Sequence, residues 1–241
     1  MFLWPYVMVA MIFALGSIYG SIEEYSLRMQ VSNPATYLLA SSVIAMASLY
    51  ILDAVAGFVL HTRWLGTLPY IVLSPIKTPI LLMIAGLPES IISTFISITA
   101  VLPAMIYFEG INGAIKVLLV LLVVIAGMMP MLGFSALIGS ALLIVKEESN
   151  IFSSISPFIL LISGIFYPLE VLPRILQIAA RAVPVTYVVE ATKLITTYLV
   201  PRAALLFLAL YGIGALTVLY NALAVMALKG AERAVKSRGV L

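Results

Sequence analysis

Cysteine is absent from this 241-residue chain, and histidine occurs once, at His61. Without thiols the chain can hold no disulfide, iron–sulfur centre or thiolate-bound metal, and a single histidine excludes any site that needs two. Charged residues are also scarce, because Asp, Glu, Lys and Arg together make up 10% of the sequence, whereas soluble domains contain about 25%. The net charge of +3 is too small to indicate nucleic-acid binding.

A phosphate-binding loop is also missing. The sequence contains no GxxxxGK[ST] motif, so we expect no nucleotide to bind this chain in the usual way. The string GFSA at residues 133–136 could suggest an intramembrane protease with Ser135 as its nucleophile. Such a serine needs a histidine in a neighbouring span to activate it, whereas His61 lies at the edge of a predicted span. We therefore expect neither an enzymatic activity nor a bound cofactor or metal in this chain.

Apolar residues are abundant: they make up 63% of the sequence, and the mean hydropathy is +1.20. A water-soluble fold cannot bury so much apolar surface, so we expect lipid to be the solvent. At about 20 residues per span, the chain accommodates six spans, and we predict one all-α transmembrane domain over residues 1–241. The spans are predicted at about residues 2–22, 37–60, 90–108, 115–145, 151–167 and 203–228. The first run could be mistaken for a secretory signal, but it lacks a basic start and is long for one.

Small residues gather in the fourth predicted span, in the string GFSALIGSA at residues 133–141. Small side chains at such spacings let neighbouring helices approach backbone to backbone. We therefore predict close helix packing along the small residues Gly133, Ser135, Ala136, Gly139 and Ser140.

Two apolar segments are interrupted by prolines and cannot be simple spans. The first, residues 64–90, predicts a short helix over residues 67–74 that lies at the membrane surface. Thr67 is its expected N-cap, Pro69 is tolerated in a first helical turn, and Pro75 ends the helix.

The second interrupted segment covers residues 163–193 and carries charges among its apolar residues. It predicts a re-entrant stretch over about residues 168–200, bent at Pro168, Pro173 and Pro184, with its broken backbone buried against protein. Such broken segments often mark transport pathways. Phe166 and Tyr167 then either close an outer gate or anchor the chain at the membrane interface.

Basic residues near the predicted span ends indicate the orientation of the chain. Outside the re-entrant stretch, seven lie on the side of the two termini and two, Arg28 and Lys116, lie on the other side. Basic residues favour the cytoplasmic side, so we expect both termini and the helix at residues 67–74 to be cytoplasmic. The re-entrant stretch is then extracytoplasmic.

Asp53 is the one clear acid inside a predicted span. Buried carboxylates are costly in a membrane and usually face a cavity or a partner. Two roles remain open for Asp53: a structural ion pair or polar contact between helices, which we favour, and a proton relay.

Three segments of the chain resemble the type-2 permease family, which provides the membrane subunits of ABC exporters. GTLPYIVLSPIKTP at residues 66–79 resembles the coupling helix of the family. Residues 139–173, with the string SGIFYPLEVLP, are similar to its fourth span, short loop and fifth span. Residues 183–193, VPVTYVVEATK, resemble the Pro-x-Thr-Tyr/His-x-x-Glu-Ala pattern of the same family. Where the family usually has an acidic residue after Gly-Thr-Leu, this chain has Pro69.

The resemblance implies two sets of functional residues. Those that would couple the chain to an ATPase are Gly66, Thr67, Leu68, Pro69, Ile71, Ser74 and Pro75. Those of an outer gate are Gly164, Phe166, Tyr167, Pro168, Glu170, Pro173, Pro184, Tyr187 and Glu190.

The resemblance also implies partners. A separate ABC ATPase subunit would bind ATP and Mg, and a second permease chain, identical or related, would complete a dimer in the plasma membrane. The chain would contact the lipid bilayer and no nucleic acid, and it would export an amphipathic or lipid-like substrate. The alternative is a secondary transporter or channel that works without ATP. That class favours several intramembrane acids or an inverted repeat, neither of which is evident in the sequence.

Overall fold

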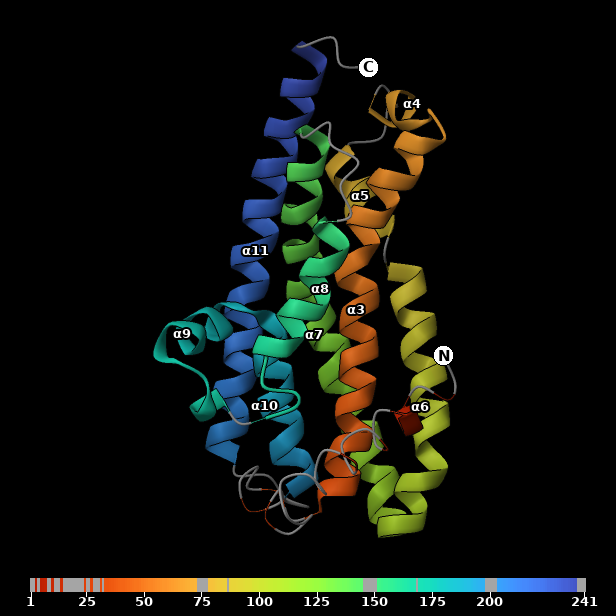
Figure 1. Cartoon of the computed structure of the whole chain (residues 1–241), viewed down its shortest axis with the longest axis vertical. Coiled ribbons are helices and arrows are strands. Elements are labelled where there is room, and N and C mark those ends of the chain that lie inside the picture. The colour runs from red at the N-terminus through yellow and green to blue at the C-terminus, as the bar shows by residue number, and fades with distance from the viewer. Residues whose placement is uncertain are drawn as a thin grey trace.

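The computed structural model describes residues 31–237 except for 32, 73–77, 86, 145–150, 168 and 198–202, and a few isolated positions before residue 31. In these residues it contains helices and no strand, so the predicted all-α class is confirmed there. The elements, labelled as in Figure 1, are α3 (Pro34–Trp64), α4 (Leu68–Val72), α5 (Thr78–Ala85), α6 (Leu87–Glu109), α7 (Ile111–Ile144), α8 (Ile151–Ile162), the 3-10 turn η1 (Leu169–Val171), α9 (Arg174–Ala182), α10 (Pro184–Thr197) and α11 (Ala203–Ser237).

Four stretches of the described chain are long and apolar enough to cross a membrane. They are Pro34–Trp64, Ile80–Glu109, Ile111–Leu143 and Ala203–Ala234. The 31 residues of α3 alone rise about 46 Å, more than the roughly 30 Å of a bilayer's hydrocarbon core. These stretches coincide with four of the six predicted spans, and their length and apolar character are compatible with a membrane protein.

The other two predicted spans have a different outcome. The span at 2–22 lies almost wholly outside the described residues. The span at 151–167 is α-helical only over the 12 residues of α8, which rise about 18 Å and are too short to cross a bilayer alone. The chain turns after α8 because Gly164 adopts a φ of +83°, a conformation that glycine reaches without steric cost.

Local sequence determines where α3 begins. Asn33 precedes it in an extended conformation, and the side-chain oxygen of Asn33 accepts hydrogen bonds from the backbone N–H groups of Ala35 and Thr36, at 3.1 and 3.4 Å. Pro34 occupies the first helical position, where its missing N–H costs nothing. The Asn-Pro pair thus starts the helix within three residues of the expected position.

Helix α7 lies in the middle of the bundle and contacts α3, α6, α10 and α11 (Figure 1). The largest apolar core forms between α3, α7, α8, α10 and α11. A second core lies nearer to α4 and joins α3, α5, α7 and α11. The long helices therefore pack side by side, as expected for spans of one domain.

Helix α7 approaches α11 and α3 at the predicted small residues. A methyl group placed on Gly133 would lie 2.6 Å from the backbone nitrogen of Asn221 in α11. A methyl group on Gly139 would lie 2.3 Å from the Val55 side chain in α3. The prediction of close packing at these two glycines is therefore confirmed.

The two ends of the bundle differ (Figure 1). Helix α4, the C-terminal end of α11 and the ends of α3 and α7 lie at one end, which we call the α4 end. The α6–α7 turn and the start of α3 lie at the opposite end. Helices α9 and α10 lie in the half of the bundle away from α4. This places the two interrupted segments towards opposite ends of the molecule.

Candidate functional site

The α4 end begins where α3 stops. Gly66 has a φ of +68°, and its backbone N–H donates to the Arg63 carbonyl at 3.0 Å, so the chain turns out of α3. Thr67 precedes α4, and both its backbone N–H and its hydroxyl donate to the Thr62 carbonyl, at 2.9 and 3.2 Å. Pro69 occupies the second position of α4, where no helical hydrogen bond is lost. The predicted helix at 67–74 therefore exists as Leu68–Val72, while Ser74 and Pro75 lie outside the described residues.

Several large side chains at the α4 end have no cover within the described structure. Trp64, Leu65 and Tyr70 are 77%, 62% and 76% exposed. Leu68 and Ile71 point inward by comparison, because both are partly buried and Leu68 packs against the second apolar core. The tip of this end is therefore an exposed apolar surface.

The α4 end is also fastened to the bundle. The Arg63 guanidinium donates to the Leu142 carbonyl of α7 at 2.7 Å. Together with the bonds of Thr67 to Thr62, this contact links α4, α3 and α7. These contacts join the start of α4 to two of the long helices of the bundle.

The broken segment has the bends that its prolines predict. Pro173 immediately precedes α9, and Val183 is extended between α9 and Pro184, the first residue of α10. Pro168 lies outside the described residues. Two hydroxyls secure the second bend: Thr186 donates to the Ala180 carbonyl at 2.7 Å, and Tyr220 of α11 donates to the Ala182 carbonyl at 2.5 Å. Protein groups thus satisfy the backbone carbonyls freed by the break.

The aromatic residues of this segment are held by neighbouring groups. Phe166 is partly buried and packs against the main core. The Tyr167 hydroxyl donates to the Leu161 carbonyl. Tyr187 packs so tightly on α11 that a methyl group on Gly212 would lie 2.4 Å from its ring. Phe166 and Tyr167 therefore lie just after the end of α8, whereas Tyr187 forms part of the contact between α10 and α11.

Four charged side chains gather around the broken segment: Glu170, Arg181, Glu190 and Lys193, from η1, α9 and α10. Glu190 and Lys193 make no direct ion pair in this part of the described structure, but they interact at longer range. Partial desolvation raises the pKa of the Glu190 carboxyl, against the opposing pull of Arg181 and Lys193. Desolvation also lowers the pKa of the Lys193 ammonium, opposed by Glu170 and Glu190.

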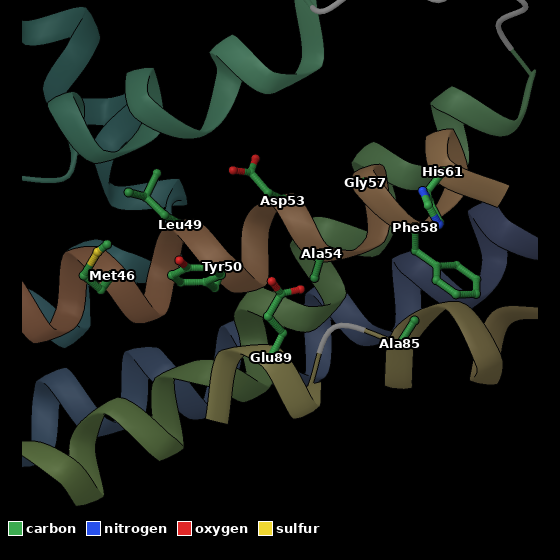
Figure 2. A pocket seen from close by; sticks show the side chains of 10 residues that line it. All are labelled: Met46, Leu49, Tyr50, Asp53, Ala54, Gly57, Phe58, His61, Ala85 and Glu89. Carbon is green, nitrogen blue, oxygen red and sulfur yellow. The ribbon is translucent and has the colours of Figure 1, made fainter. Parts of the chain in front are cut away.

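A pocket of about 620 Å³ opens on the side of α3, next to the point where α5 meets α6 (Figure 2). One face of α3 lines most of it, because the lining residues recur every three or four positions. Figure 2 shows Tyr50, Asp53, Phe58 and His61 on α3 and Glu89 on α6. Asp53 also accepts a hydrogen bond from the Ser156 hydroxyl of α8, which is the kind of contact between helices that we favoured for it.

Sequence reasoning identified Asp53 but missed Glu89 as a pocket residue. The third span is predicted to begin at about residue 90, which leaves Glu89 outside it, whereas α6 begins at Leu87 and includes Glu89. The stripe of Tyr50, Asp53, Gly57 and His61 along one face of a predicted span was the available signal. Its partner across the pocket could not be identified from spacing. Among the described residues, no group of three or more His, Asp or Glu residues could hold a metal ion.

The structure thus separates the candidate residues into three places: the α4 end, the broken segment and the pocket beside α3. Comparison with protein-family models and with curated protein sequences finds no match for this chain.

Proposed function

We propose that this chain is the membrane subunit of an ATP-driven ABC exporter of the type-2 permease class. A separate ATPase subunit binds ATP and Mg at the cytoplasmic face, and a second permease chain, identical or related, completes the pathway. The assembly lies in the plasma membrane with both termini of this chain in the cytoplasm, and it moves an amphipathic or lipid-like substrate outward.

The exposed apolar tip of the α4 end carries this proposal. Trp64, Leu65 and Tyr70 are large, apolar and uncovered at the end of a helix that is fastened to the bundle. A cluster of this kind is typical of a protein interface, and aromatic residues are favoured in its centre. Its position in the segment that resembles a coupling helix supports an ATPase as the partner.

The hydrogen bonds described above supply a mechanical route. Closure of the ATPase would push α4, and the Thr67–Thr62 and Arg63–Leu142 bonds would carry that motion into α3 and α7. The broken segment, in the half of the bundle away from α4, would respond as an outer gate through its contacts with α11. In this mechanism the chain performs no chemistry of its own.

Tyr70→Asp tests the interface because Tyr70 is 76% exposed, so we expect the fold to tolerate its replacement. The tagged chain is purified from its native membrane, and ATP hydrolysis by the eluate is measured. We expect the variant to lose hydrolysis by about tenfold or more, the effect of removing one central interface aromatic. Tyr107→Asp is the matched control, since Tyr107 is also exposed but lies near the opposite end of the bundle, and it should retain wild-type activity.

Leu68→Asp and Ile71→Asp should also uncouple ATP hydrolysis from transport. Both side chains are partly buried within the chain itself, so these variants need a parallel check of folding by gel filtration. If the purified chain instead moved solute across vesicles without ATP or a second subunit, it would be a secondary transporter or channel and the proposal would be wrong.

A further inference from the structure

The pocket beside α3 is lined by two carboxylates that belong to apolar, span-length stretches. Asp53 and Glu89 both line it, and both belong to helices long and apolar enough to span a bilayer. Asp53 lies 11 residues before the end of α3, or roughly 16 Å along the helix axis. Acids inside a membrane are costly unless they face a cavity or a partner. Asp53 and Glu89 both face the same cavity.

No cation of the described structure neutralises these two carboxylates. Glu89 has no ion pair in the described part of the chain, and the partner of Asp53 is the neutral Ser156 hydroxyl. The ten described lining residues include neither Lys nor Arg. The pocket therefore has an uncompensated negative character, which complements a positively charged occupant.

The remaining walls favour an occupant with an apolar body. Tyr50 and Phe58 contribute aromatic rings; Phe58 lies on the side of α3 that faces Ala85, across the pocket from Asp53, and Met46 and Leu49 extend the apolar lining towards the middle of the helix. Aromatic faces attract cations, most strongly where water is excluded. A volume of about 620 Å³ lies within the usual range for sites that hold drug-sized molecules.

We propose that this pocket binds a lipophilic organic cation, with its charge near Asp53 and Glu89 and its apolar body against Tyr50 and Phe58. The exposed Gly57 and His61 leave the pocket open at the side of α3, so such a cation can enter from the bilayer. The inference deepens the proposed export function, on which it rests, because it assigns the cargo to a chemical class.

Two probes of matched shape and opposite charge test the inference: tetraphenylphosphonium and tetraphenylborate. Binding of each to the purified chain is measured by equilibrium dialysis with labelled probe in detergent. We expect the phosphonium to bind and the borate not to bind. Asp53→Asn and Glu89→Gln should each weaken phosphonium binding by about tenfold, the effect of removing one charged partner, and the double variant should abolish it.

Glu232→Gln is the control, because it removes a carboxylate from the last turns of α11 that does not line the pocket, and it should bind as the wild type does. Asp53→Asn also alters the contact with Ser156, whereas Glu89 has an exposed side chain, so Glu89→Gln keeps the test valid if the first variant misfolds. Equal binding of the two probes, or phosphonium binding that survives the double variant, would overturn the inference. Because the assay uses no ATPase, its failure is separate from failure of the Tyr70 experiment.

Discussion

Lys116 connects three helices at the end of the bundle away from α4. Its ammonium lies 2.5 Å from a Glu109 carboxylate oxygen and 2.7 Å from the Thr196 carbonyl. The side chains of Lys116 and Glu109 are 8% and 14% exposed, so both charges are largely shielded. The sequence places Lys116 at the very start of the predicted span 115–145, on the side away from the termini, but α7 begins at Ile111 and Lys116 is buried in the bundle. A buried pair of this kind is costly to break because one charge is left without a partner.

The Lys116→Met variant should therefore lower the free energy of unfolding by about 3 kcal/mol, because it strands the Glu109 carboxylate. The double variant Lys116→Met with Glu109→Gln should recover much of that loss, since no unpaired charge remains. Thermal unfolding of the purified protein in detergent measures both. Equal losses in the single and double variants would show that the pair is not coupled.

At the scale of elements, glycine sets the spacing between α7 and its neighbours. Gly133 allows the backbones of α7 and α11 to touch near Tyr220 and Asn221, and the Asn221 side chain donates to the Met129 carbonyl at 3.1 Å across the same contact. In lipid, burial of apolar surface does little to stabilise the association of helices. Close packing and hydrogen bonds between the helices therefore stabilise this contact. One added methyl group at such a position must push two backbones apart.

Gly133→Ala should accordingly destabilise the bundle by about 1–3 kcal/mol through overpacking. Gly214→Ala in α11 is the matched control, because a methyl group there meets no atom within 4 Å, and the better helix propensity of alanine should leave stability equal or slightly higher. Denaturant titrations of the two variants measure the difference. A loss of stability in both, or in neither, would contradict the assigned contact.

At the scale of the whole molecule, the arrangement of α3, α7 and α11 places α4 and the α6–α7 turn at opposite ends of the bundle (Figure 1). The roughly 46 Å length of α3 exceeds the hydrocarbon thickness of a bilayer. If the long helices cross a membrane, these two ends must face different compartments.

Single thiols test that topology cleanly, because the chain contains no cysteine of its own. Tyr70→Cys places a thiol at the α4 end and Ile111→Cys places one at the α6–α7 turn, and both positions are exposed. We expect a membrane-impermeant maleimide to label the Ile111 variant in intact cells and the Tyr70 variant only after permeabilisation. The reverse pattern would invert the orientation and remove the basis for an ATPase at α4.

Besides the membrane class, which follows from composition, the features predictable from the residues alone depend on local chemistry. Thr67 and the prolines of residues 64–90 predict the short helix that forms as α4, the small residues at 133–141 predict the close packing of α7, and Pro184 predicts the break before α10. Each of these follows from residues close together in the chain, because capping, proline geometry and helical periodicity act over a few positions.

Which distant groups meet depends on how the helices pack. The tertiary structure shortened the expected fifth span to α8, placed Glu89 beside the same pocket as Asp53, and brought Lys116 to Glu109 and Thr196. Residues from separate helices become neighbours through the packing and rotation of those helices, and no spacing within one helix encodes that. The charge and shape of the pocket, and hence its inferred organic cation, are for this physical reason properties of the folded bundle.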